Sequence, residues 1–241
     1  MGKVVIKPAF INTKNVRNFS AMMDGLALAE GEGRMGAVYG AAGRGKTRTA
    51  QVFAANNDCR YLRVATVWRG SELEFLRGLA KEIGIVSPPH RKGPCFAALV
   101  ENLVADPRPV MVDEIEKMPK TYLDIIRDLT DLSAAPFVLI GEEELKGMLQ
   151  DHARAWSRTY QKLEFAPIAV GDVLFYASDA TGLKLTTEVA GILHNASGGD
   201  FRVVRRDIIA LVQIINARGT REITEEMARI AVKAGLSGGK G

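Results

Sequence analysis

The chain of 241 residues lacks any long apolar segment. No run approaches the roughly 18 consecutive apolar residues that a membrane-spanning helix needs. Lys3, near the N-terminus, is followed neither by a long apolar core nor by a small-residue cleavage site, which argues against export. These absences predict a cytoplasmic protein without a membrane partner.

Cysteine and histidine are too few and too scattered to indicate a disulfide framework or a zinc site. Cys59 and Cys95 lie far apart and neither belongs to a Cys-x-x-Cys pair, so we expect two reduced thiols. His90, His152 and His194 show no metal-ligand spacing. The sequence therefore predicts neither a disulfide framework nor a zinc site.

The composition is that of a globular protein, with 47% hydrophobic and 25% charged residues. A chain of this length can hold one large domain, or one medium domain with a small partner domain. The net charge of +4 is compatible with nucleic-acid binding, because lysine and arginine neutralise phosphates, but it does not require such binding.

The first two thirds of the chain alternate short apolar runs with longer helical patterns, which predicts a parallel sheet flanked by helices. Strands buried on both faces have this nearly continuous apolar character. The expected strands are Met35–Tyr39, Tyr61–Thr66, Pro109–Val112, Phe137–Ile140 and a short Lys162–Phe165. The expected helices between them are Lys46–Ala55, Ser71–Ile83, Cys95–Ala105, Tyr122–Ser133 and Glu143–Gln150.

After Pro167 only helical patterns remain. They cover Val170–Ala180, Thr186–Asn195, Phe201–Ala217 and Thr224–Ala234. We therefore expect an α/β domain over residues 1–166, a small all-helical lid domain over 167–236, and a disordered tail over 237–241.

Residues 40–47 match the phosphate-binding pattern G-x-x-x-x-G-K-[ST] in full, between an expected strand and an expected helix. Backbone N–H groups of such a loop and the following helix N-terminus point at phosphate. Lys46 is expected to reach the β- and γ-phosphates of ATP, and the Thr47 hydroxyl to bind Mg²⁺. The predicted nucleotide-binding residues are Gly40, Ala41, Ala42, Gly43, Arg44, Gly45, Lys46 and Thr47.

Two carboxylates follow an apolar strand that ends at Val112. The carboxyl ends of parallel strands share one edge of a sheet, where ligands bind, so this strand end can lie beside the phosphate-binding loop. Asp113 is expected to bind Mg²⁺ through water and Glu114 to polarise the attacking water. The pair predicts ATP hydrolysis.

In its motifs the chain resembles AAA+ ATPases, most closely the transposition ATPases of the MuB and TnsC kind. The order and spacing of the motifs carry this resemblance. They are the segment Phe10–Val16, residues 32–34 before the first strand, the phosphate-binding loop, Val112-Asp113-Glu114, and residues 137–141. The opening segment looks like the stretch that covers the adenine in such proteins.

The resemblance implies oligomers in which an arginine of one subunit completes the ATP site of the next. Arg158 occupies the matching region, with Arg154 as the alternative. An arginine of the helical domain that contacts the γ-phosphate is also implied; Arg202 is preferred, and Arg205, one helical turn along, is the alternative. The other interpretation of these arginines is that they are solvated surface charges.

One position departs from the family pattern. Many AAA+ proteins place a polar residue such as Asn at the end of the fourth strand, where it contacts the attacking water. Here Ile140 is followed by Gly141 and Glu142, and an ionised glutamate cannot donate a hydrogen bond. The assignment of Glu142 to this role stays open, and the departure favours slow hydrolysis, stimulated by DNA or a partner.

The resemblance further implies an ATP-dependent filament or ring that holds duplex DNA through phosphate contacts and passes it to a transposase, in a bacterial or phage-infected host cytosol. The candidate DNA-binding residues are Arg69, Arg91, Lys92, Lys117 and Lys120. We favour Arg91 and Lys92, because the proline-containing segment that includes them, residues 88–93, is expected to be an exposed loop; a merely solvated basic loop fits the pattern as well.

Two other functions use the same core. A secretion ATPase resembling ExeA would normally continue into a transmembrane segment, and a replication initiator or helicase loader into a DNA-reading or docking extension. The sequence shows neither, and we expect partner contacts on the ATPase core or the helical domain.

Overall fold

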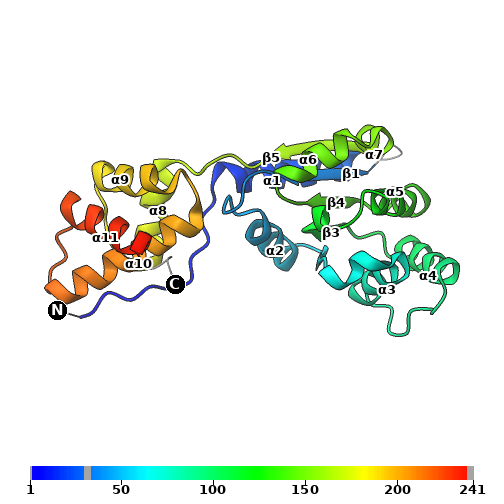
Figure 1. Cartoon of the computed structure of the whole chain (residues 1–241), viewed down its shortest axis with the longest axis horizontal. Coiled ribbons are helices and arrows are strands. Elements are labelled where there is room, and N and C mark those ends of the chain that lie inside the picture. The colour runs from blue at the N-terminus through cyan, green and yellow to red at the C-terminus, as the bar shows by residue number, and fades with distance from the viewer. Residues whose placement is uncertain (1, 30–33, 238–241) are drawn as a thin grey trace. The chain divides into compact units, whose positions relative to one another are not determined.

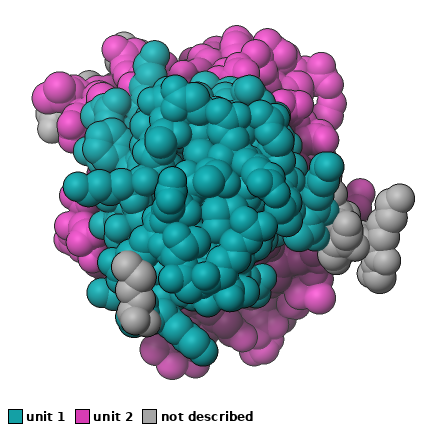
Figure 2. Space-filling model, turned by 90° about the vertical axis from the view of Figure 1, so that its left-hand side faces the viewer, with its two compact units in different colours: residues 1–17, 42–44, 166–241 teal, residues 18–41, 45–165 magenta. Residues whose placement is uncertain are grey.

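The computed structural model describes residues 2–29 and 34–237. Its chain divides into two compact units, coloured separately in Figure 2. The sheet unit comprises residues 18–41 and 45–165, and the helical unit comprises residues 1–17, 42–44 and 166–241. Glu32 and Gly33 of the family resemblance, and residues 238–241 of the expected tail, lie outside the described residues.

The sheet unit is built on five parallel strands (Figure 1). They are β1 (Met35–Tyr39), β2 (Arg60–Arg63), β3 (Val110–Asp113), β4 (Phe137–Ile140) and β5 (Thr159–Glu164), in the spatial order β2-β3-β4-β1-β5. This confirms the predicted fold class. Strand β4 lies between β1 and β3, so the acidic strand is not the immediate neighbour of the strand that precedes the phosphate-binding loop.

Strand register places the ends of β1, β3 and β4 at one level. Ile140 of β4 pairs with Val38 of β1 on one side and with Asp113 of β3 on the other. The loop that begins at Gly40, two residues beyond Val38, therefore leaves the sheet at the edge where Asp113 lies.

Helices cover both faces of the sheet. They are α1 (Lys14–Leu28), α2 (Lys46–Asn56), α3 (Glu72–Glu82), α4 (Lys92–Ala105), α5 (Tyr122–Ser133), α6 (Glu143–Gln150) and α7 (Ala153–Arg158), with the 3₁₀ turns η1 (Thr66–Gly70) and η2 (Ile115–Lys117). Alternate strand residues face opposite sides. Val110 and Val112 belong to a core with α3 to α7, whereas Met111 belongs to a core with α1 and α2.

Several boundaries differ from those expected. Helix α1 was not predicted, although Phe19, Met22, Met23 and Leu26 have helical spacing and are buried against the sheet. Strand β2 ends at Arg63, because the chain turns into η1. Helix α4 already begins at Lys92, so the expectation that Lys92 lies in an exposed loop is wrong.

The helical unit consists of α8 (Val170–Thr181), α9 (Thr187–Ser197), α10 (Phe201–Arg218) and α11 (Glu225–Ser237) around one apolar core. An extended N-terminal segment packs on it. The Asn216 side chain accepts from the backbone N–H of Val4 at 2.8 Å and donates to its carbonyl at 2.9 Å. The expected domain boundary at residue 166 stays a prediction.

No helix among the described residues has the length and apolar character to cross a membrane.

Candidate nucleotide site

The phosphate-binding loop connects β1 to α2, as the motif requires. Gly45 precedes the helix with a φ of 91°, and the first turn of α2 carries no acidic side chain. The unpaired N–H groups and the positive end of the helix dipole therefore meet no competing carboxylate from that turn. This geometry suits a phosphate.

Two glycines of the loop cannot be replaced without strain. Gly40 has a φ of 139°, and a Cβ there would lie 2.7 Å from the carbonyl oxygen of Phe165. Gly43 has a φ of 76°, and a Cβ there would lie 2.0 Å from the Asp200 carboxylate. Gly40 of the motif is thus required by close backbone approach as well as by conformation, and Gly43, which the motif leaves open, is favoured by its left-handed conformation.

Lys46 is buried, with 8% of its surface exposed. Its Nζ donates hydrogen bonds to the carbonyl oxygens of Gly40 at 2.7 Å and Ala41 at 3.0 Å. The ammonium group is therefore held over the loop that is predicted to bind the phosphates.

The tip of the loop belongs to the helical unit. Arg44 donates to the carbonyl oxygen of Gly198 at 2.8 Å, and the backbone N–H of Phe201 donates to the carbonyl oxygen of Gly43 at 2.9 Å. Asp200 caps α10 by accepting the N–H of Arg202 at 2.7 Å. The start of α10 is thus bound directly to the middle of the phosphate-binding motif.

The Asp113 carboxylate is buried and held by two donors. Its Oδ1 accepts the backbone N–H of Glu114 at 3.0 Å, and its Oδ2 accepts the Tyr61 hydroxyl at 2.7 Å. Burial and the bond to Asp113 raise the pKa of Tyr61, so this hydroxyl keeps its proton and remains a donor. Sequence reasoning missed Tyr61, because nothing in the sequence tells that β2 pairs with β3.

The Glu114 carboxylate is bound by two cations. Arg63 pairs with its Oε1 and Lys117 with its Oε2. Burial raises the pKa of Glu114, but the bonds from Arg63 and Lys117 outweigh it and hold that pKa below its ordinary value. The backbone of Glu114 is left-handed, with a φ of 62°, which is costly for a residue with a side chain.

A second acid, which the sequence analysis did not consider, lies beside the end of β4. Glu142 is exposed, whereas Glu116 of the turn η2 is half-buried. The Glu116 Oε2 atom is buried beside Gly141 and has no hydrogen-bond partner among the described residues. Burial raises the pKa of Glu116. Sequence reasoning missed this residue.

Of the two candidates for an arginine acting between subunits, Arg158 is the last residue of α7, half exposed, and 3.6 Å from the Asp131 carboxylate. Arg154 is exposed on the same helix. In the helical unit, Arg202 and Arg205 are exposed near the start of α10. Their roles stay predictions.

The candidate DNA-binding residues fall into two groups. Lys92, Lys117 and Lys120 pair with Glu72, Glu114 and Asp151 respectively. Arg69 and Arg91 are exposed, and the described residues offer neither of them an ion pair. A phosphate would meet the two arginines directly but would have to displace a carboxylate from each lysine.

Nothing in the described ranges groups three or more His, Cys, Asp or Glu side chains as metal ligands. Mg²⁺ bound with a nucleotide keeps several waters and takes one or two protein ligands beside the phosphates. Thr47 and Asp113 supply oxygen atoms of the required kind.

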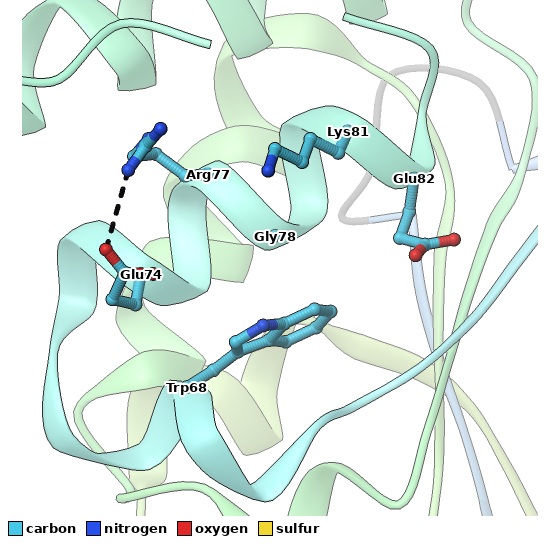
Figure 3. Close-up of a pocket in the computed structure, with 6 residues that line it drawn as sticks. All are labelled: Trp68, Glu74, Arg77, Gly78, Lys81 and Glu82. Carbon is cyan, nitrogen blue, oxygen red and sulfur yellow. Dashed lines mark ion pairs between the residues drawn. The ribbon is translucent and has the colours of Figure 1, made fainter. Parts of the chain in front are cut away.

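A small cavity of about 120 Å³ lies between η1 and α3 (Figure 3). Trp68 packs against Gly78, where a Cβ would lie 2.3 Å from the indole ring. Two acidic and two basic side chains line the cavity and balance in charge: Glu74, Arg77, Lys81 and Glu82. It includes none of the predicted site residues.

Comparison with known proteins settles the family. A model of the AAA domain matches residues 29–149, half of the chain. The chain belongs to the AAA family. It is accordingly an ATPase, and ATP is its nucleotide.

Curated relatives place the chain among the MuB-like members. It is 28% identical to the Mu-like prophage FluMu DNA transposition protein B of Haemophilus influenzae, over 82% of this chain and 70% of the relative. It is 25% identical to the ATP-dependent target DNA activator B of Escherichia phage Mu, over 94% of this chain and 73% of the relative. The resemblance inferred from the motifs is confirmed.

Solved structures share the fold. The CDC6P protein of Pyrobaculum aerophilum has a TM-score of 0.68 at 16% identity, covering 97% of this chain and 72% of that protein. The Aeropyrum pernix ORC2 protein has a TM-score of 0.65 at 15% identity, covering 96% and 69%. At such identities the likeness concerns the fold alone.

Proposed function

We propose that this ATPase binds duplex DNA without sequence preference when it holds ATP, assembles on it as a filament or ring, and delivers it to a transposase. The names of the curated relatives, DNA transposition protein and target DNA activator, support this proposal. The place of action would be the cytosol of a bacterium or a phage-infected host.

Within the site we assign roles by chemistry. Residues 40–47 bind the phosphates, Lys46 neutralises their charge, and Thr47 and Asp113 hold Mg²⁺, directly or through water. When bound, the ion would neutralise charge between the β- and γ-phosphates. Glu114 orients the water that attacks the γ-phosphate, and Arg158 or Arg154 of a neighbouring copy stabilises the charge that develops there.

The observation that carries the proposal is the double ion pair on Glu114. Arg63 and Lys117 take up two of the about four lone-pair positions of this carboxylate and hold its pKa below the ordinary value, so Glu114 is a weaker hydrogen-bond acceptor for the attacking water. Hydrolysis is therefore slow while both cations are in place, so the protein would stay bound to ATP for long periods. Persistence in the ATP state suits a protein that must remain on DNA until a transposase arrives.

DNA has the chemistry to relieve this restraint. The Lys117 side chain is 42% exposed and the Arg63 side chain 58%, so both can be reached from solvent. Backbone phosphates compete with a carboxylate for lysine and arginine. Each cation drawn to a phosphate frees one oxygen of Glu114, which would couple DNA binding to faster hydrolysis.

Electron microscopy of the purified protein on random-sequence duplex DNA tests the proposal, with ATP, without nucleotide, and with Lys46→Ala. Regular assemblies on DNA that need both ATP and Lys46 are the expected result. Absence of DNA association at physiological salt in every state would contradict it and would favour a loader or protein-remodelling role.

A further inference from the structure

Tyr61 lies beside the acidic strand on the same face of the sheet. It pairs in register with Met111 of β3, and both side chains belong to the core under α1 and α2. Asp113 follows Met111 by two residues and so shares its face. The Tyr61 hydroxyl, leaning along the strand direction, reaches the Asp113 carboxylate.

A third residue also contacts the Tyr61 hydroxyl. Gln51 of α2 donates from Nε2 to the Tyr61 hydroxyl oxygen at 3.4 Å. The hydroxyl accepts from Gln51 and donates its single hydrogen to Asp113 Oδ2 at 2.7 Å. An ionised carboxylate can only accept, so the chain from Gln51 through Tyr61 to Asp113 has one consistent polarity.

Both Asp113 oxygens are thereby anchored, one by Tyr61 and one by the backbone N–H of Glu114. A carboxylate offers about four lone-pair positions, so the remaining ones stay available to a metal ion or its water. Two anchors fix the plane of the carboxylate and therefore the direction of those positions.

We propose that Tyr61 is a positioning residue that orients the Asp113 carboxylate for Mg²⁺. The inference rests on the proposed role of Asp113 as a metal ligand. Groups that orient a metal ligand without touching the metal typically change metal affinity about 10- to 100-fold when they are removed.

The test is the Mg²⁺ concentration that gives half-maximal binding of a fluorescent, non-hydrolysable ATP analogue. Tyr61→Phe removes one oxygen and keeps the ring that packs on the core. We expect it to raise this concentration about tenfold, at the low end of that range, because the Glu114 N–H remains as an anchor. Affinity for the analogue in EDTA should stay unchanged.

Tyr122→Phe is the matched control. Its hydroxyl donates to the carbonyl oxygens of Trp68 at 3.2 Å and Arg69 at 3.3 Å, in the same unit but not to a predicted ligand. It should lose comparable thermal stability and leave the Mg²⁺ requirement unchanged. An equal rise in both tyrosine variants would overturn the proposal.

A double-mutant cycle separates this inference from the role of Asp113. Asp113→Asn should raise the Mg²⁺ requirement, and adding Tyr61→Phe to it should have no further effect. If Asp113→Asn has no effect, the metal assignment itself fails. If Asp113→Asn acts but Tyr61→Phe does not, only the role of Tyr61 is overturned.

Should Tyr61→Phe fail to fold, Gln51→Ala provides a second variant. Gln51 is exposed, and its removal takes away a donor that helps to hold the Tyr61 hydroxyl oxygen beside Asp113. A smaller rise in the Mg²⁺ requirement supports the proposal, and an unchanged requirement counts against it.

Discussion

Lys117 is bound to Glu114 across the single 3₁₀ turn that follows β3. The contact joins a residue predicted to bind DNA to the residue predicted to activate water. Because Arg63 holds the other oxygen, we expect the rate of hydrolysis to depend on two separate ion pairs. Under the proposed function, the strength of these ion pairs relative to a contact with DNA phosphate would set how far DNA stimulates the ATPase.

Removing Lys117 should speed hydrolysis in the absence of DNA. A partly exposed ion pair contributes up to about 1 kcal/mol, so Lys117→Ala should raise the basal ATPase rate on the order of fivefold. The DNA-stimulated rate should rise less. Phosphate release with and without duplex DNA measures both quantities.

Lys120→Ala is the control for this experiment, since Lys120 is three residues away and pairs with Asp151. Its basal rate should equal that of the unchanged protein. A basal rate for Lys117→Ala at or below that of Lys120→Ala would show that the ion pair does not restrain Glu114.

The predicted arginine between subunits can be identified by mixing variants. Arg158→Ala should lose ATPase activity alone, and so should Glu114→Gln. If Arg158 acts on a neighbouring subunit, mixing the two variants restores part of the activity. Some sites then combine the intact Glu114 of an Arg158→Ala subunit with the intact Arg158 of a Glu114→Gln neighbour. The same mixture with Arg154→Ala decides between the two arginines: the variant that loses activity alone and regains it in the mixture identifies the residue.

Arg91 and Lys92 are adjacent, but their ion pairing differs. Arg91 is exposed without a carboxylate partner among the described side chains, while Lys92 pairs with Glu72. Arg91→Ala should reduce the slope of log affinity for DNA against log salt by about 1, because one phosphate contact disappears. Lys92→Ala should change it less, since its contact already competes with Glu72. Equal slopes for the two variants would show that the ion pair with Glu72 does not weaken the contact of Lys92 with DNA.

Asp207 on α10 should make stability depend on pH. It is fully buried, its Oδ2 lacks a hydrogen-bond partner in the described part of the chain, and burial raises its pKa despite the ion pair with Arg206. The folded protein therefore binds this proton more tightly than the unfolded chain, and ionisation costs stability as pH rises from the unfolded value of about 3.9.

Asp207→Asn does not titrate at this position. Its melting temperature relative to the unchanged protein should therefore improve between pH 4.5 and pH 7. Glu225→Gln is the control, because it removes a carboxylate from the exposed surface of α11. The account of Asp207 would be contradicted if the melting temperature of Asp207→Asn, relative to the unchanged protein, stayed constant or fell between pH 4.5 and pH 7.

Local patterns were enough to predict the sheet and the phosphate-binding loop. Strands β1 and β4 have the predicted bounds, because apolar runs between turn residues mark buried parallel strands. The motif at residues 40–47 lies at the predicted junction of strand and helix. Both features are encoded in neighbouring residues.

Contacts between distant residues could not be predicted. Arg63 meets Glu114, and Tyr61 meets Asp113, only because β2 pairs with β3 in one register. Lys92 begins a helix rather than ending a loop, since Cys95, Leu99 and Leu103 bury that helix against the core from its first turn. Such features depend on tertiary pairing, which a single sequence does not reveal.

The central claim is that ATP controls DNA binding, and the affinity of the protein for a random-sequence duplex tests it most directly. Fluorescence anisotropy at physiological salt would compare ATP, ADP and no nucleotide, using Glu114→Gln to keep ATP intact. We predict tight binding by Glu114→Gln with ATP and at least tenfold weaker binding with ADP or without nucleotide, a difference of about 1.4 kcal/mol or more. Equal affinity in all three states would contradict the account.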